Sequence, residues 1–182
     1  MLALNFSPFP ELKTGRLLLR RLERTDANEM FFLRSNENVL RYIGREPTKT
    51  ISDAEEFINK INKAVDENES IFWAIAFLNE PSTVIGAICI WNIKQEHFRG
   101  EIGYMLHPDH WRKGIMKEAI NAVVDYGFTV LGLHSMEALL NPENIASSSV
   151  LESTGFVKEG HLKESFYFNG DFKDEAIYSR LK

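Results

Sequence analysis

Arg112, Lys113 and Gly114 form a short basic turn of a kind that can hold an anion. The turn opens an amphipathic segment, and the first turn of a helix leaves about four backbone N–H groups unpaired at the positive end of the helix dipole. Gly114 has no Cβ, so a phosphate can approach the backbone closely, and the two basic side chains stand out in a chain of net charge -5. The alternative is that Gly114 only opens a tight turn and that the basic pair is solvated.

The usual nucleotide-binding and metal-binding motifs are absent from the sequence. It contains neither G-x-x-x-x-G-K-[ST] nor G-x-G-x-x-G, which argues against a P-loop nucleotidase and a dinucleotide-binding oxidoreductase. The five histidines show no zinc-ligand spacing such as H-E-x-x-H, so we expect no metal. The anion is therefore expected to be of another kind.

A strand and a helix must hold this turn in place. Residues 101–106 are mainly apolar and end before Pro108, which cannot donate to a β-ladder, so they predict a strand. After the turn, apolar residues recur at helical spacing while polar residues line the other face, which predicts a helix packed on a sheet. The apolar positions are Met116, Ala119, Ile120, Val123, Gly127 and Val130.

Composition and charge indicate one ordinary soluble domain. A chain of 182 residues with 44% hydrophobic residues is long enough to bury a sizeable core. Its pI near 5.6 argues against a general nucleic-acid binder. The single cysteine, Cys89, fits a reducing cytoplasm, and the sequence shows neither a membrane-length apolar run nor a secretory signal. We therefore expect a cytoplasmic protein without a membrane partner.

The rest of the chain predicts a mixed α/β fold in a single domain, 1–182, with a loose lead-in at residues 1–13. Capping-box spacings at Asp26/Glu29 and Ser52/Glu55 predict the starts of two helices. Asn169 and Gly170 predict a hairpin turn near the end of the chain. Strands are expected over residues 16–22, 72–78, 83–93, 134–140, 155–159, 165–168 and 176–181, and further helices over 39–43 and 142–153.

Two segments resemble the GCN5-related N-acetyltransferases (GNAT), in the branch of RimJ/RimL-type ribosomal-protein N-terminal acetyltransferases. EIGYMLHPDHWRKGIMKEA, from Glu101, is similar to that family's strand, pyrophosphate loop and helix, and NIASSSVLESTGF, from Asn144, is similar to the branch's Asn-x-x-Ser segment. The order of elements also agrees from Thr14 to Leu181. The resemblance implies a mainly antiparallel twisted sheet flanked by helices, with acetyl-CoA in a gap where strand 101–106 splays from strand 134–140.

The resemblance also implies which residues bind the cofactor. Backbone groups of Met105 and Leu106 would hold the pantetheine arm, and Asn144 would contact the cofactor near its thiol. The pyrophosphate would lie on the loop made by Trp111, Arg112, Lys113, Gly114, Ile115 and Met116. The family's loop is usually Q/R-x-x-G-x-G/A, so this chain departs from it at Trp111 and at Met116. The Met116 side chain either crowds the cofactor or points into the core.

Attack of an amine on a thioester needs a base and donors for the oxyanion and the leaving thiolate. Glu101 resembles the branch's strand carboxylate and is the expected base, unless it is solvated or pairs with Arg99; His97 is an alternative base. The general-acid Tyr of many relatives outside this branch is Leu151 here. Ser147 is the expected donor to the departing sulfur, a role the branch suggests, unless its hydroxyl only serves the start of a helix.

We therefore predict an acetyl-CoA-dependent N-acetyltransferase that acts on a primary amine, such as a protein N-terminus, in a ternary complex. Cys89 is expected to be buried in the wrong strand for an acyl intermediate, and Trp91 and Tyr104 are expected to build the core. One alternative is a small-molecule amine, such as an antibiotic, a polyamine or an amino acid. An acidic groove would suit a polyamine, and one is suggested by Asp53, Glu55, Glu56, Asp66, Glu67 and Glu69. The other alternative is a non-catalytic acyl-CoA-binding module. The oligomeric state stays open, with a homodimer as one option.

Overall fold

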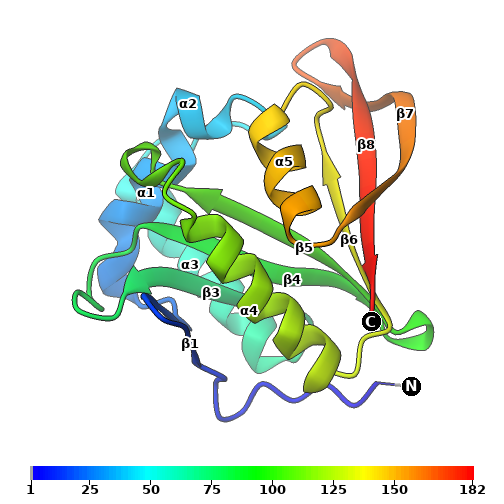
Figure 1. The fold of residues 1–182 in the computed structure, drawn as a ribbon. Coiled ribbons are helices and arrows are strands. Elements are labelled where there is room, and N and C mark those ends of the chain that lie inside the picture. The colour runs from blue at the N-terminus through cyan, green and yellow to red at the C-terminus, as the bar shows by residue number, and fades with distance from the viewer. Residues whose placement is uncertain (1) are drawn as a thin grey trace.

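The computed structural model describes residues 2–182 and shows a mixed α/β domain built on an eight-stranded sheet (Figure 1). The strand order is β1-β2-β3-β4-β5-β6-β8-β7, and the only parallel pair among the described strands is β5–β6. The strands are β1 Leu12–Lys13, β2 Leu17–Arg21, β3 Ile71–Phe77, β4 Gly86–Lys94, β5 Arg99–Leu106, β6 Ser135–Leu140, β7 Val157–Phe168 and β8 Asp171–Leu181. This confirms the mainly antiparallel sheet that the sequence predicts.

Helices cover both faces of the sheet. The α-helices are α1 Ala27–Ser35, α2 Glu37–Leu40, α3 Ile51–Asp66, α4 Ile115–Thr129 and α5 Ile145–Ser153, and the 3-10 turns are Arg24–Asp26, Gln95–His97 and Pro108–His110. One core cluster joins α4 to the sheet, and a second joins α1 and α3 to the other face. Among residues 2–182, none of the helices combines the length and the apolar character that a membrane crossing needs.

β5 and β6 separate soon after they pair. Their parallel register holds at Arg99–Ser135, Gly100–Met136 and Glu101–Glu137 and ends there. Beyond Glu101 the two strands diverge, and α5 lies beside the opening (Figure 1). The predicted splay between strands 101–106 and 134–140 is therefore confirmed.

β5 presents alternate residues to the two faces of the sheet. Ile102, Tyr104 and Leu106 pack with the α4 core, whereas Met105 packs with the core of α1 and α3. Glu101 shares the parity of Met105, so its side chain belongs to the α1–α3 face. This alternation makes β5 the wall between two regions of the molecule.

Several predicted details were wrong. The helix predicted to start after Asp26 does begin at Ala27, but the observed capping boxes use Glu23 with Asp26 and Thr50 with Asp53, three and two residues before the predicted ones. Residues 2–13 are not loose, because Leu2 and Phe6 are buried in the core and Leu12–Lys13 pairs with β2; Met1 lies outside the described residues.

The other differences lie in the second half of the chain. Predicted strands 155–159 and 165–168 form one strand, β7, that continues through two register shifts. The helix predicted from Pro142 begins at Ile145. The hairpin turn is confirmed, with Asn169 and Gly170 both at positive φ.

Candidate active site

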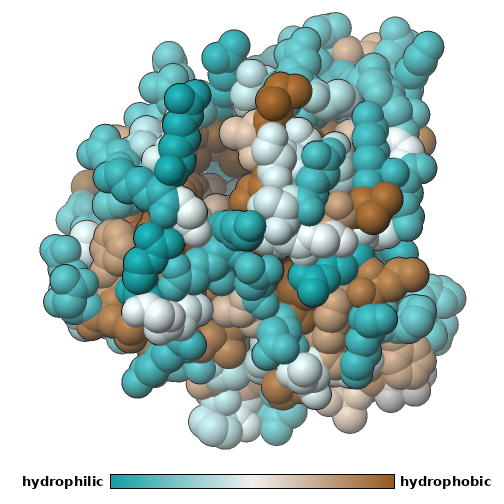
Figure 2. Space-filling view, in the orientation of Figure 1, coloured by the Kyte–Doolittle hydropathy of each residue, from teal (hydrophilic) through white to brown (hydrophobic). Residues whose placement is uncertain are grey.

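Two cavities meet where β5 and β6 separate. The turn cavity, about 880 Å³, is bordered by residues 111–116 and by α5. The strand cavity, about 980 Å³, has Cys89 and Trp91 of β4 and Glu101 and Gly103 of β5 on its wall. Tyr104, Met105, Asn144 and Ser147 border both. Figure 2 shows a hollow with hydrophobic side chains inside it, at the position between α2 and α5 in Figure 1.

The turn cavity collects nearly all the residues that the sequence assigns to the cofactor. Its lining includes Met105, Leu106, Trp111, Arg112, Gly114, Ile115, Met116 and Asn144. Lys113 does not border the cavity; its carbonyl oxygen accepts a hydrogen bond from Arg16 Nη1 at 3.1 Å.

Backbone geometry at the turn leaves N–H groups free. Gly114 is the N-cap of α4 at φ 73°, in the left-handed region, and Arg112 is also left-handed at φ 59°. In the described part of the chain, the amides of residues 112–114 have no intramolecular acceptor. The first amides of α4 add further donors, as at any helix start. The turn therefore presents several N–H groups and a basic side chain to one cavity, which suits a phosphate group.

A contact from a distant segment holds the turn. Arg16 forms an ion pair with Glu118 of α4 at 2.7 Å and also donates to the carbonyl of Lys113. The Thr14 hydroxyl donates to the same carboxylate at 2.5 Å. Burial alone would raise the pKa of Glu118, but the hydrogen bonds from Thr14 and Arg16 outweigh it and lower the pKa.

Trp111 and Met116, the two departures from the usual loop pattern, take different positions. The indole N–H of Trp111 donates to the carbonyl of Leu106 at 2.8 Å, which turns the ring back toward the end of β5. Met116 is 8% exposed and belongs to the core between α4 and the sheet, although it also borders the turn cavity. Of the two orientations open to Met116, the structure shows the core one.

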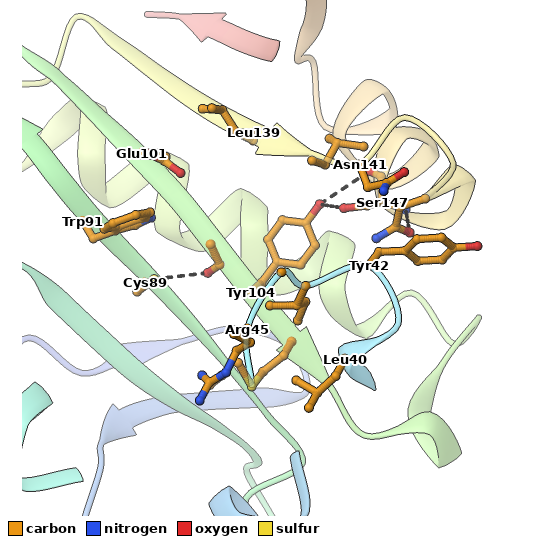
Figure 3. Close-up of a pocket in the computed structure, with 18 of the residues that line it drawn as sticks. Leu40, Tyr42, Arg45, Cys89, Trp91, Glu101, Tyr104, Leu139, Asn141 and Ser147 are labelled. Carbon is orange, nitrogen blue, oxygen red and sulfur yellow. Dashed lines mark hydrogen bonds between the residues drawn. The ribbon is translucent and has the colours of Figure 1, made fainter. Parts of the chain in front are cut away.

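Tyr104 and Ser147 are joined at the meeting point of the cavities. The two hydroxyl oxygens lie 2.6 Å apart (Figure 3). Asn144, the N-cap of α5, accepts a hydrogen bond from Ser147 N at 3.1 Å, so the helix cap is Asn144 and not the Ser147 hydroxyl. Burial raises the pKa of Tyr104 to about 12 despite the hydrogen bond with Ser147, so the phenol is a hydrogen-bond donor at neutral pH.

The position of Tyr104 at the junction of the two cavities was missed in the sequence. The residue packs on the core as expected, but its hydroxyl also reaches both cavities. Its partner Ser147 is 43 residues away, so the only available signal was an aromatic residue with a polar tip near the end of the strand.

Glu101 lies on the wall of the strand cavity and is 9% exposed. It stands opposite Trp91 in the β4–β5 register, and Asn92 Nδ2 donates to one carboxylate oxygen at 3.2 Å. Burial raises the pKa of Glu101; the Asn92 hydrogen bond opposes this and the nearby Glu137 charge adds to it. Arg99 pairs with Glu137 at 2.7 Å instead, so Glu101 is neither a solvated strand end nor the partner of Arg99.

Three further expectations change. Cys89 borders the strand cavity, yet burial raises the pKa of its thiol to about 12, so it is a poor nucleophile at neutral pH. His97 is exposed and borders neither cavity, which removes the alternative base. The acidic residues of 53–69 border neither cavity and do not form the expected acidic groove.

No cluster of three or more His, Cys, Asp or Glu residues suited to a metal ion occurs within residues 2–182.

Comparison with known proteins places this architecture among acetyltransferases. Residues 16–157 match the family model described as acetyltransferase (GNAT) domain. An uncharacterized N-acetyltransferase of Bacillus subtilis, YoaA, is 39% identical over 96% of this chain and 98% of the relative.

Two solved structures have the same fold. The spermidine N-acetyltransferase of Vibrio cholerae, in complex with CoA and spermine, superposes with a TM-score of 0.81 at 31% identity over 92% of this chain and 96% of the other. A ribosomal-protein-S5-alanine acetyltransferase of Vibrio fischeri superposes with a TM-score of 0.80 at 26% identity, covering 94% and 96%.

Proposed function

The chain belongs to the acetyltransferase (GNAT) family, and on that premise we propose that it acetylates a primary amine by direct transfer, with Glu101 as the base. It is an acyltransferase, an acetyl-CoA-dependent N-acetyltransferase of the GNAT type. What remains to be assigned is which residues carry the reaction and which amine is used. The observation that carries our assignment is a buried carboxylate on the wall of one cavity together with a hydroxyl pair that borders both cavities.

The turn cavity fits acetyl-CoA by its donors. Arg112, Gly114, Ile115 and Met116 border it, and the unpaired amides at the start of α4 suit the pyrophosphate. Lys113 would act through its backbone amide and its charge, since it does not border the cavity. Met105 and Leu106 lie where β5 still pairs with β4 but has separated from β6, so this end of the strand is placed to hold the pantetheine arm, with Asn144 nearer the junction. The bound molecule supplies an activated acetyl thioester; the protein supplies the proton transfers.

Glu101 would take the proton from the acceptor amine. A protonated amine has no free lone pair, so a base must accept its proton before or during attack. A carboxylate whose pKa is raised by burial is a stronger base than a solvated one. Glu101 has no ion-pair partner among the described residues, and its single hydrogen bond, from Asn92, leaves lone pairs free toward the cavity.

Tyr104 and Ser147 would stabilise the negative charge that develops on the cofactor side. Either hydroxyl can donate to the other, and the second proton is then free to point into the junction. A donor aimed at developing charge in a partly dry site stabilises the transition state more than it would in water. The pair would fill the place of the family's general-acid Tyr, which is Leu151 here and is fully buried.

Direct transfer is supported by the state of Cys89. It is the one cysteine of the chain. Its thiol donates to the carbonyl of Gly103 at 3.5 Å, and its pKa of about 12 leaves almost no thiolate at neutral pH. An acetylated-cysteine intermediate would need that thiolate, so attack by the amine itself is the simpler route.

The acceptor amine would enter the strand cavity. The volume of the strand cavity, about 980 Å³, lies at the upper end of the range typical for small-molecule sites, roughly 300–1,000 Å³. This favours a small amine over a folded protein, and a protein N-terminus, which the RimJ/RimL resemblance suggests, is the second candidate. Relatives of both kinds exist: the Vibrio cholerae protein is named for spermidine and the Vibrio fischeri protein for a ribosomal protein.

Calorimetric titration with acetyl-CoA, CoA and ATP, combined with a turnover assay on small amines and on Ala- or Ser-initiated peptides, tests the proposal. We expect acetyl-CoA and CoA to bind with micromolar Kd, ATP to remain silent, and CoA release to need an amine. Binding of acetyl-CoA without turnover on any amine would leave only the acyl-CoA-binding module. Faster turnover on the peptides than on every small amine would favour the protein N-terminus.

A further inference from the structure

Two arginines face the strand cavity without a carboxylate partner. Arg34 comes from the last turn of α1, and Arg45 comes from the connection between α2 and α3. The Nε atoms of both side chains are buried and have no hydrogen-bond partner, and neither guanidinium takes part in an ion pair among the described residues. Both residues are half-buried, and charges removed from water are normally paired, so two unpaired guanidinium groups in one cavity require an explanation.

Packing fixes the Arg34 side chain and holds the connection that carries Arg45. The Arg34 guanidinium stacks on the ring of Phe57 at 3.4 Å, which occupies its flat face but leaves its in-plane N–H donors free. Thr48 N donates to the carbonyl of Arg34 at 2.8 Å, which ties the α2–α3 connection to α1. The ring of Phe166 lies so close to Gly44 that a Cβ there would be 1.9 Å away, so β7 holds the connection from the other side.

The acidic residues around the cavity do not neutralise this pair. Asp174 accepts from His161 at 2.6 Å, and Glu175 accepts from Ser165 at 3.0 Å. Glu101 accepts from Asn92, and Glu37 is exposed on α2. In Figure 3, Glu101 lies near Trp91 on one side of the pocket, whereas Arg45 lies apart from them, on the connection after α2. The cavity therefore has a carboxylate at one place and two unpaired guanidinium groups at another.

We propose that the acceptor is a small amine that also carries an oxyanion, a carboxylate or a phosphate, and that Arg34 and Arg45 bind this oxyanion while the amine faces Glu101. This inference rests on the proposed acetyl transfer and names its substrate class. A guanidinium binds either oxyanion through two parallel hydrogen bonds, and one anion between two such groups removes their repulsion.

The charges needed for this role persist at neutral pH. Burial and the neighbouring Arg45 charge lower the pKa of Arg34 to about 9, and burial also lowers the pKa of Arg45. Both pKa values are lowered because no counter-ion lies nearby to offset the burial. Arg34 nevertheless remains cationic at any pH below its pKa of about 9. The same pair would repel a polycation such as spermidine, the molecule for which the Vibrio cholerae relative is named.

Matched amines test the proposal directly. β-Alanine is compared with propylamine, γ-aminobutyrate with butylamine, and phosphoethanolamine with ethanolamine, with spermidine as a polycation. We expect at least one anionic member to exceed its neutral partner in kcat/KM by roughly 10- to 100-fold, the range of one or two charge-assisted hydrogen bonds. A preference only in the phosphate pair identifies a phosphorylated amine, and a preference only in the other pairs identifies an amino acid.

Variants then assign the preference to the two arginines. Arg34→Gln and Arg45→Gln should each lower the anionic-to-neutral ratio about 10-fold, mainly through KM, and the double variant should bring it near one. Arg45→Lys, which keeps the charge, should retain part of the preference. Arg24→Gln is the matched control, because Arg24 is exposed, pairs with Glu55 and borders neither cavity. Removing a half-buried charge that has no counter-ion should not unfold the protein, which urea denaturation verifies.

The outcomes separate this inference from the acetyl transfer itself. If acetyl-CoA binds and neutral amines or spermidine are acetylated as well as the anionic ones, the inference is wrong and the proposed function stands. If acetyl-CoA does not bind, the proposed function fails. Calorimetric binding of the same amine pairs then decides the inference without turnover: a preference for the anionic members supports it, and equal binding overturns it.

Discussion

The turn cavity and the strand cavity share a wall at Tyr104 and Met105, but the chain builds them differently. Most of the turn cavity comes from two continuous stretches, residues 104–117 and 143–153, with a few residues from 38–43. The strand cavity is assembled from the end of α1, α2 and the α2–α3 connection, α3, β3, β4, β5, the end of β6, α5 and the β7–β8 hairpin. One cavity is thus largely a local structure, and the other exists only after the whole sheet has formed.

This difference matches the chemistry of the two sites. A pyrophosphate is bound mainly by backbone amides, which every residue supplies, so a strand, a turn and a helix start are sufficient. An acceptor is recognised by side chains, and here these side chains project from segments that lie far apart in the sequence. Such segments can change independently, so the strand cavity is where members of one fold acquire different substrates.

The largest expected effect separates the cavities through Glu101. Glu101→Gln keeps the size of the side chain but removes the base, so kcat/KM should fall about 100- to 10,000-fold, the usual contribution of a general base. The Kd for acetyl-CoA should stay within about 2-fold, because Glu101 borders the strand cavity and not the turn cavity. Steady-state kinetics and calorimetry on the same preparation measure both.

The pH dependence of kcat/KM is a second test of Glu101→Gln. With a base whose pKa is raised, wild-type kcat/KM should increase with pH through that pKa, and Glu101→Gln should lose this step. A variant that keeps both the rate and the pH step would show that another group, or water, takes the proton.

The second effect tests the wall between the cavities. Tyr104→Phe or Ser147→Ala should lower kcat about 10- to 100-fold if their shared hydrogen bond positions a donor to the leaving thiolate. Because the two hydroxyls act as a pair, the double variant should be little worse than either single one. Additive losses in kcat, or losses only in stability, would mean that the pair serves packing alone.

The third effect belongs to the turn cavity. Gly114→Ala places a Cβ at φ 73°, where it meets only the Arg16 side chain at 3.6 Å, so backbone strain and not crowding is the cost. The free protein can relieve about 1–2 kcal/mol of this strain by leaving the observed turn conformation. Binding must restore that conformation, so acetyl-CoA affinity should fall roughly 5- to 30-fold while the preference among acceptors stays unchanged. Gly160→Ala is the matched control, since nothing lies within 4 Å of its added Cβ. A shift in acceptor preference would show that the cavities are coupled.

The two cavities also differ in how far the sequence predicts them. The turn at residues 111–116 could be predicted, because it depends on residues that are close in sequence. The splay of β5 from β6 was expected only from the family resemblance, since the two strands are far apart in the sequence, and the start of α5 was predicted three residues too early. Tyr104–Ser147, Arg34 and Arg45 could not be predicted, because their partners or cavity neighbours lie in other elements. The capping boxes at Glu23 and Thr50 were missed for a different reason, since several polar residues near each helix start offered the same spacing.

A smaller effect concerns the cost of holding Glu101 in the strand cavity. Burial raises the pKa of Glu101 in the folded state, so folding favours the protonated acid. The protonated side chain therefore contributes fully to the free energy of unfolding below the pKa of the unfolded chain, near 4.3. This contribution is lost as the pH rises through the pKa of the folded state. Glu101→Gln mimics the protonated acid. It should unfold like wild type at acidic pH and be more stable by roughly 1 kcal/mol at neutral pH, as measured by urea denaturation. Equal stability at both pH values would show that burial costs Glu101 nothing.

The smallest effect tests whether the turn cavity is as local as its sequence suggests, because Arg16 reaches it from nearly 100 residues away. Arg16 pairs with Glu118 and donates to the carbonyl of Lys113, so Arg16→Gln should weaken acetyl-CoA binding a few-fold and cost less than about 1 kcal/mol of stability. The pKa of Glu118 is lowered in the folded state, so its contribution is present above the unfolded pKa and is lost as pH falls through the folded value. The stability difference between wild type and Arg16→Gln should therefore shrink on acidification, whereas Arg24→Gln, at an exposed pair remote from the turn, should leave acetyl-CoA binding unchanged. If Arg16→Gln binds acetyl-CoA as wild type does, the turn needs no distant support, and the contrast between a local and an assembled cavity becomes sharper.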